Sequence, residues 1–366
     1  MCTPTSFAAR AMGVLLVAPA LACSSTDKGP APVPVDPPKV VNTECGTPTG
    51  YPGDELCIPP PDPSVGFQLH YGPSNYADEA EIARYLIQPG QEIIECVYVD
   101  APNDSHIFYE EFHVRRRPGS HHLIVSELNT DVPDGVRPCQ TSPQLVVGLV
   151  GGTSVARDWP DPNLVIPENE GLASELPARA QIEMQLHFFN STNAPLLREA
   201  WMNIHYKDPA LVTTVQASLG HYAGLGMNVP PSTTQVIRGA AVAPADIRIV
   251  NLYSHYHAHT QRFTAYKVTG TERTLVYESF DWQEPGVIPL DSAHQNPPPN
   301  AESKVTGGLS GILELKAGDR FEFECEIVND SSAPLRWANE ALTAEMCILR
   351  GTYAPSLGRA WSSVSF

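Results

Sequence analysis

Proline interrupts this chain so often that long helices have little room to form. The 366 residues include 36 prolines and 26 glycines, and only 17% of them are charged. The apolar runs between these turn-forming residues are short, and several alternate apolar with polar side chains, as strands do. We therefore expect an all-β protein with two antiparallel β-sandwich, jelly-roll-like domains and a cleft between them.

Alternating runs of this kind occur in both halves of the chain. The only helical pattern spans residues 76–86, where a short helix is expected. Strands are expected at residues 93–99, 107–114, 122–125 and 182–188, and then at 235–242, 246–259, 262–268, 273–277, 311–315, 320–328 and 346–351.

The length predicts about two domains. The Lys207-Asp208-Pro209 stretch is the expected border, and residues 284–303 read as a long polar, proline-rich loop. The expected division is residues 1–22 as a signal peptide, 23–62 as a modified cysteine and proline-rich linker, 63–207 as the first domain, and 208–366 as the second.

The N-terminus has the features of an export signal. Arg10 precedes an apolar run, residues 11–22, that is too short to be a stable membrane span. The following Ala20-Leu21-Ala22-Cys23 resembles the lipobox of bacterial lipoproteins, so we expect Cys23 to carry a lipid that anchors the protein to the outer membrane or cell surface. Cleavage after Ala22, giving a periplasmic or secreted protein, is the alternative. No later segment is long and apolar enough to span.

Six cysteines remain after Cys2 and Cys23 are set aside, and an even number in an exported chain implies disulfides. Six cysteines allow fifteen pairings, and free buried thiols are the alternative. Nearness in sequence favours Cys45–Cys57 and Cys325–Cys347, which leaves Cys96–Cys139.

The charge balance argues against nucleic acid as a partner. The formal net charge is −18 and the pI is near 5.0, so no basic surface is expected to meet phosphates. The one basic run, Arg115-Arg116-Arg117, is expected to be a solvated turn.

Histidines are the residues that point to chemistry. His255, His257 and His259 alternate within the expected strand 246–259, so they should project from one face. His121 and His122 are adjacent and can share a face only if the backbone is irregular, which the preceding residues 117–120 could supply. Taken singly, these residues, His187 and Met346 all have ordinary explanations as surface or core side chains.

Imidazoles together with a thioether would suit copper, especially Cu(I), better than zinc or hard cations. The order His-His, Gln-x-His, His-x-His and Glu-Met-Cys resembles the ascorbate-dependent type II copper monooxygenases, which include peptidylglycine α-hydroxylating monooxygenase and dopamine β-monooxygenase. The resemblance covers residues 65–355 and lies mainly in these motifs. It implies an electron-transfer copper held by His121, His122 and His187, and an oxygen-activating copper held by His255, His257 and Met346.

The same resemblance implies family disulfides at Cys325–Cys347 and Cys96–Cys139, and a family glutamine at Gln185. It implies an enzyme with two copper ions per chain, which uses O2 and an electron donor such as ascorbate to hydroxylate a C–H bond. The substrate is expected to be a small organic molecule or a peptide, with contact to a membrane through the lipid anchor only.

Some positions depart from the family pattern. Tyr253 stands where the peptide-amidating enzyme has an arginine that holds its substrate carboxylate, and Ile348 and Arg350 stand where it has Asn and Tyr. The peptidylglycine substrate is therefore not carried over, although Arg350 is an alternative anion anchor. His259 is a further alternative to Met346 as the third ligand.

Two other functions fit the same residues. One is a non-catalytic copper-binding or copper-buffering surface lipoprotein on the same fold. The other is a β-sandwich adhesion or carbohydrate-binding lipoprotein with unrelated histidines. Copper binding and reductant-dependent turnover separate the three.

Overall fold

The computed structural model describes residues 48–139, 146–153, 171–282, 285–290, 312–358 and 360–365. The expected signal peptide, Cys23, most of the linker and most of the expected loop 284–303 lie outside the described residues. Among the described residues, no helix is long and apolar enough to cross a membrane.

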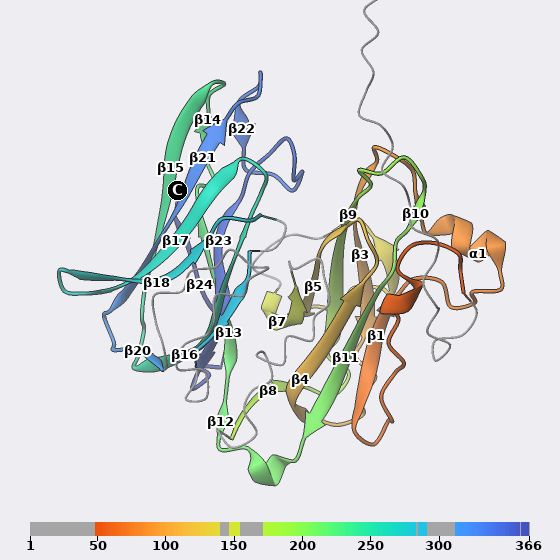
Figure 1. The fold of residues 1–366 in the computed structure, drawn as a ribbon. Helices are drawn as coiled ribbons and strands as arrows, with labels where there is room; N and C mark the ends of the chain where they lie inside the picture. The colour runs from red at the N-terminus through yellow and green to blue at the C-terminus, as the bar shows by residue number, and fades with distance from the viewer. Residues whose placement is uncertain are drawn as a thin grey trace, which may run out of the picture. The chain divides into compact units, whose positions relative to one another are not determined.

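The first sandwich consists of two five-stranded sheets (Figure 1). Its elements are β1 Gly66–Tyr71, α1 Glu79–Arg84, β2 Leu86–Ile87, β3 Glu92–Asp100, β4 Ile107–Arg116, β5 Ser120–Leu128, β6 Gly135–Arg137, β7 Val146–Thr153, β8 Leu172–Leu176, β9 Gln181–Phe189, β10 Leu196–Leu197, β11 Ala200–Lys207 and β12 Thr214–Val215. One sheet has the order β1-β11-β4-β8-β12, the other β6-β3-β9-β5-β7, and β10 pairs with β2.

The second sandwich consists of a six-stranded and a four-stranded sheet. Its elements are β13 Ala217–Ala223, β14 Asn228–Val229, β15 Thr233–Val242, β16 Ile247–Tyr256, β17 Thr260–Thr269, β18 Glu272–Ser279, β19 Val287–Pro289, β20 Leu313–Leu315, β21 Arg320–Asn329, β22 Leu335–Arg336, β23 Cys347–Ala354 and β24 Trp361–Ser365. The larger sheet has the order β19-β16-β23-β13-β24 with β20 also on β16, and the smaller has the order β15-β21-β17-β18.

Each sandwich has its own hydrophobic core, so the predicted all-β, two-sandwich architecture is confirmed. One core draws on residues between Phe67 and Ile204, and the other on residues between Leu219 and Trp361. The expected border at 207/208 lies between these two cores. The chain passes from one to the other through a 3-10 helix, Pro209–Leu211, and through β12, which still pairs with β8 of the first sandwich.

The expected short helix is present as α1, and its sequence explains where it begins. The side chain of Asp78 accepts hydrogen bonds from the backbone N–H groups of Ala80 and Glu81, which is an N-cap. The helix is shorter than the predicted range 76–86 and spans Glu79–Arg84.

Two predicted disulfides are present, Cys96–Cys139 and Cys325–Cys347. The second joins β21 of the four-stranded sheet to the first residue of β23 in the facing sheet, so it ties the two layers of the second sandwich together. Cys57 is also disulfide-bonded, and its predicted partner Cys45 lies outside the described residues.

The basic run is not a solvated turn, and that prediction was wrong. Arg116 and Arg117 are only 3% and 2% exposed. The Arg117 guanidinium donates to a carboxylate oxygen of Asp54 at 2.8 Å and to one of Glu199 at 2.6 Å. A buried arginine is tolerated here because two carboxylates compensate its charge.

A buried histidine away from the other histidines predicts how stability depends on pH. His221 is fully buried, its Nδ1 lies 3.0 Å from the Ser363 hydroxyl, and burial lowers its pKa to about 3. The unfolded chain takes up this proton near pH 6.5 but the folded chain does not, so stability present above pH 6.5 is lost as the pH falls.

We expect His221→Asn, which keeps a polar atom near Ser363, to lose less stability on acidification than wild type. Between about pH 7.5 and about pH 5 the difference should be about 2 kcal/mol. Urea unfolding of both metal-free proteins at the two pH values measures it, and protons taken up elsewhere cancel in the comparison. Equal acid sensitivity of the two proteins would contradict the prediction.

Candidate metal centre

The first pair of histidines lies on a distorted strand. In the β5–β9 register, Ser120 is opposite Phe188 and His122 is opposite His187, so His121 is the extra residue of a β-bulge. The bulge allows neighbouring side chains to approach the same side, and the His121 and His122 ring centroids are 5.2 Å apart. The predicted irregular backbone is therefore confirmed.

The bulge also brings in His187 from the neighbouring strand. The His187 ring centroid is 5.1 Å from that of His121 and 5.2 Å from that of His122. These three predicted ligands thus come together, although residues 122 and 187 are far apart in the sequence, because β5 and β9 are adjacent antiparallel strands.

The second pair lies at the end of β16. His255 is the residue before the last of that strand and His257 follows it, with ring centroids 5.3 Å apart. The strand does not extend to His259, so the prediction that all three project from one face was wrong. A turn in which the Thr260 N–H donates to the His257 carbonyl at 3.2 Å ends the alternation.

His259 has other partners. Its Nε2 lies 3.0 Å from the Leu342 carbonyl and its Nδ1 lies 3.4 Å from a carboxylate oxygen of Asp330. Both ring nitrogens of His259 therefore contact groups that are not among the predicted metal ligands.

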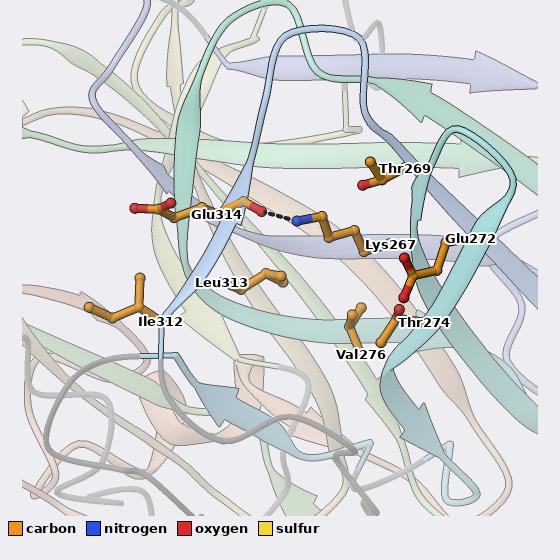
Figure 2. A pocket seen from close by; sticks show the side chains of 8 residues that line it. All are labelled: Lys267, Thr269, Glu272, Thr274, Val276, Ile312, Leu313 and Glu314. Carbon is orange, nitrogen blue, oxygen red and sulfur yellow. Dashed lines mark hydrogen bonds between the residues drawn. The ribbon is translucent and has the colours of Figure 1, made fainter.

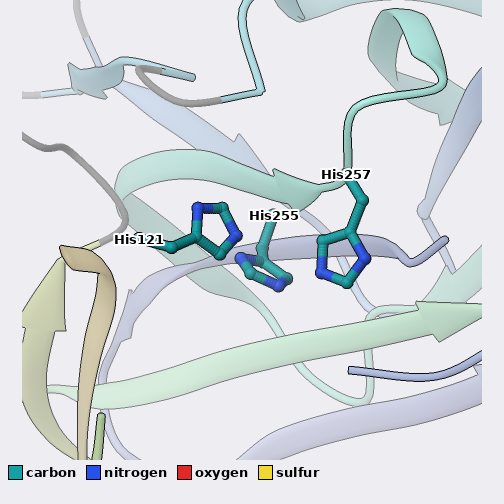
Figure 3. Close-up of side chains that lie close together, drawn as sticks. All are labelled: His121, His255 and His257. Carbon is teal, nitrogen blue, oxygen red and sulfur yellow. The ribbon is translucent and has the colours of Figure 1, made fainter. Parts of the chain in front are cut away.

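The two pairs and His187 form one histidine cluster that draws on both sandwiches. Potential ligand nitrogens of His121, His255 and His257 all lie within 4.8 Å of one another (Figure 3). The His121 ring centroid is 5.4 Å from that of His255 and 5.7 Å from that of His257. Ligands of a tetrahedral ion with bonds of 2.0–2.1 Å lie about 3.3 Å apart, so ion binding would draw these rings closer. The histidine cluster comprises His121, His122, His187, His255 and His257.

This grouping differs from the expected assignment, which placed His121 with His122 and His187 rather than with His255 and His257. His121, expected with His122 and His187, lies just as near to the second-sandwich pair. His121 is therefore the residue at which the two expected ligand sets meet.

Burial keeps four of these imidazoles neutral. Exposure of the five side chains does not exceed 7%. Burial is the main cause that holds the pKa values of His121, His122 and His255 well below 6.5, and neighbouring rings lower them further. The same main cause lowers the pKa of His257 to about 3. A neutral imidazole has a lone pair free to bind a metal ion, which the protonated form lacks.

Several of these lone pairs have no partner. Leaving a buried polar atom without a hydrogen bond is costly, so several such atoms in one cluster are candidate positions for binding a ligand. Among the described residues, no hydrogen-bond partner reaches His121 Nε2, His122 Nδ1, His187 Nδ1 or His257 Nε2.

In the His187 and His257 rings, the nitrogen that is not left unpaired contacts another group of the protein. His187 Nε2 donates to a carboxylate oxygen of Glu92 at 2.7 Å, and this bond is the main cause that lowers the pKa of Glu92. His257 Nδ1 lies 3.4 Å from the Ala344 carbonyl. Such contacts orient the rings and leave Nδ1 of His187 and Nε2 of His257 for a metal, as in known metal sites.

Glu345 holds the backbone beside His257. One of its carboxylate oxygens accepts from the His257 N–H at 2.5 Å and from the Met346 N–H at 2.8 Å. The predicted ligands His257 and Met346 therefore share one carboxylate through their backbones. Burial raises the pKa of Glu345 to about 7, although both N–H groups act to lower it.

Sequence reasoning assigned no role to Glu92 or Glu345. Glu345 stood within the Glu-Met-Cys motif and could have been suspected there. No sequence pattern pointed to a role for Glu92, because its contact with His187 depends on the pairing of β3 with β9. Glu92 also accepts from the Ala341 N–H at 3.0 Å, so one carboxylate contacts both sandwiches.

One cavity of the structure lies away from the histidines. A cavity of about 630 Å³ is lined by Lys267, Glu272, Val276, Leu313 and neighbouring residues, and its lining includes no histidine (Figure 2). Lys267 Nζ donates there to the Glu314 carbonyl at 2.7 Å. This cavity does not coincide with the histidine cluster.

Comparison with known proteins does not identify the chain. No family model matches it, and no curated protein matches it. A solved structure described as the crystal structure of the STIV MCP is similar over 74% of this chain and 93% of that chain, with 11% sequence identity and a TM-score of 0.27. A likeness this weak says nothing about function.

The contact of Glu92 with His187 predicts its effect on metal binding. We expect Glu92→Gln to weaken binding of the ion held by His187 by about 10- to 100-fold, because the ring loses the carboxylate that orients it and raises its basicity. Competition with a chromophoric chelator measures the dissociation constant.

The chain offers a matched control for this change. His106 and Glu175 form a similar histidine–carboxylate contact of 3.2 Å at an exposed position. Glu175→Gln should leave metal affinity unchanged. Equal losses in the two variants would show that the effect of Glu92 is not local.

Proposed function

We propose that the chain is an exported, copper-dependent monooxygenase that hydroxylates a C–H bond of an organic substrate with O2 and a reductant such as ascorbate. The observation that carries the proposal is the histidine cluster, in which five buried imidazoles from both sandwiches converge. The motif order that resembles the type II copper monooxygenases supports it.

The ligand types favour copper. Neutral imidazoles suit copper, and the thioether of Met346, whose backbone N–H donates to Glu345, is the ligand type that favours Cu(I) in particular. Calcium and magnesium prefer oxygen ligands, and structural zinc sites commonly use thiolates. The cysteine next to Met346, Cys347, is in a disulfide and offers no thiolate.

Bound copper would supply one-electron redox chemistry and activation of dioxygen. The overall reaction converts R–H, O2, two electrons and two protons into R–OH and water, and a donor of the ascorbate class supplies the electrons. The protein's own contribution is to hold neutral ligands in place, to orient His187 and His257 through their second nitrogens, and to exclude bulk water. The Trp282 ring, 5.1 Å from that of His121, is part of this enclosure.

The proposal assigns His122 and His187, with His121, to the electron-transfer ion. It assigns His255 and His257, with Met346, to the oxygen-activating ion. Three protein ligands would leave a further coordination position open, as an open-site metal catalyst needs.

Export is part of the proposal. Disulfides persist in oxidising compartments, and Cys96–Cys139 and Cys325–Cys347 agree with such a location. Lipidation of Cys23 would place the enzyme on a membrane surface, and a secreted or periplasmic form is the alternative.

Copper stoichiometry and oxygen uptake test the proposal together. After copper loading and dialysis, wild type should retain two ions per chain, and His122→Ala and Met346→Ile should each retain about one, because each removes one ligand of a three-ligand set. With ascorbate and a substrate, wild type should consume O2 and yield a hydroxylated product. His257→Ala should lose nearly all of this turnover.

His259→Ala is the matched control, since it lies two residues from His257 but has partners outside the cluster. It should retain both ions and full turnover. Two retained ions with no turnover on any substrate would favour a non-catalytic copper-binding lipoprotein on this fold. No retained copper in wild type would overturn both ideas and leave a binding or adhesion module.

A further inference from the structure

A buried arginine lies beside the bulge that presents His121. Arg116 is the last residue of β4, and its side chain is buried. Its Nη1 donates to the Ser120 hydroxyl at 3.2 Å and lies 3.5 Å from the Ser120 carbonyl oxygen. Because Ser120 directly precedes His121, the guanidinium contacts the backbone at the point where the bulge begins.

The turn between β4 and β5 is fixed from two neighbouring strands. The Arg117 N–H donates to the Glu199 carbonyl at 3.0 Å. The Phe189 N–H donates to the Gly119 carbonyl at 2.7 Å. Gly119 has a φ of +88°, which other residues adopt only with strain. Arg116 therefore contacts a turn that has little freedom to move, so its charge stays in one place relative to the bulge.

The charge of Arg116 reaches two of the predicted ligands. Burial is the largest cause of the low pKa values of His121 and His122, the neighbouring rings come next, and the Arg116 guanidinium lowers both further. A positive charge that disfavours a proton on these rings also disfavours the charge of an ion bound to them. Coulomb repulsion grows with the charge of the ion, so Cu(II) is disfavoured more than Cu(I).

A charge of opposite sign contacts the third ring of the same ligand set. The first-sandwich histidines are His121, His122 and His187, and the Glu92 carboxylate accepts from His187 Nε2. That hydrogen bond is the main cause that lowers the pKa of Glu92, so its carboxylate is ionised at neutral pH. The carboxylate stabilises a divalent ion more than a monovalent one, which is the reverse of the effect of the guanidinium.

Resting on the copper sites proposed above, we propose that Arg116 is a positioning residue that holds the His121 bulge through Ser120 and biases the first-sandwich histidines toward Cu(I) over Cu(II). Reduction of this site adds one electron from a donor of the ascorbate class and lowers the charge near the guanidinium by one unit. A nearby cation therefore makes reduction more favourable, and Glu92 acts in the opposite direction. The two side chains together adjust the reduction potential of the site.

Separate Cu(I) and Cu(II) dissociation constants, measured by competition with chromophoric chelators, test the bias without requiring turnover. Met346→Ile serves as the background, because it should leave only the ion of the first sandwich. In this background, Arg116→Gln should strengthen Cu(II) binding relative to Cu(I) by about 10-fold, which lowers the reduction potential by about 59 mV. Arg116→Met should give the same shift and serves where the glutamine variant does not fold. Arg116→Lys keeps the charge, so its ratio should stay near that of the background.

Three further variants separate the charge from the contact. Ser120→Ala removes the hydroxyl contact and keeps the guanidinium, so it should change both dissociation constants by similar factors and leave their ratio unchanged. Glu92→Gln removes the opposite charge, so it should shift the ratio in the opposite direction to Arg116→Gln. Arg238→Gln, at an exposed arginine that contacts Glu324, should leave both dissociation constants unchanged.

The outcomes separate this inference from the proposed function. An unchanged ratio in Arg116→Gln and Arg116→Met would overturn the role of the charge, even in a protein that hydroxylates a substrate. A shift of the same size in Ser120→Ala would overturn it as well, because position alone would then explain the effect. Opposite shifts in the Arg116 and Glu92 variants of a protein that hydroxylates no substrate would support the inference and reject the monooxygenase. Wild type that binds neither ion would overturn both.

Discussion

The packing of five buried imidazoles against one another is the constraint on which the rest of this structure depends. Burial lowers the pKa values of four of them, so these four cannot offset their desolvation by carrying a proton and pairing with a carboxylate. Several lone pairs of the cluster also lack a partner among the described residues. Such an arrangement costs free energy without a ligand. A soft or borderline metal ion is the ligand that best satisfies the lone pairs of neutral imidazoles.

The fold builds this site from local irregularities rather than from regular strands. A bulge at His121 breaks the alternation of β5, and a turn after His257 ends β16. Glu345 then holds the backbones of His257 and Met346 with one carboxylate, and the Cys325–Cys347 disulfide fixes the strand that begins immediately after. Bulges and strand ends often re-aim side chains at functional sites.

Strand positions followed from sequence because alternation of apolar residues is a local property. The irregular backbone at His121 could also be inferred, since adjacent histidines cannot share a face of a regular strand. What could not be inferred depends on distant contacts. His121 approaches His255 through the arrangement of two sandwiches, and Glu92 reaches His187 through strand pairing. His259 was misplaced because nothing in its alternating pattern marks the turn that separates it from His257.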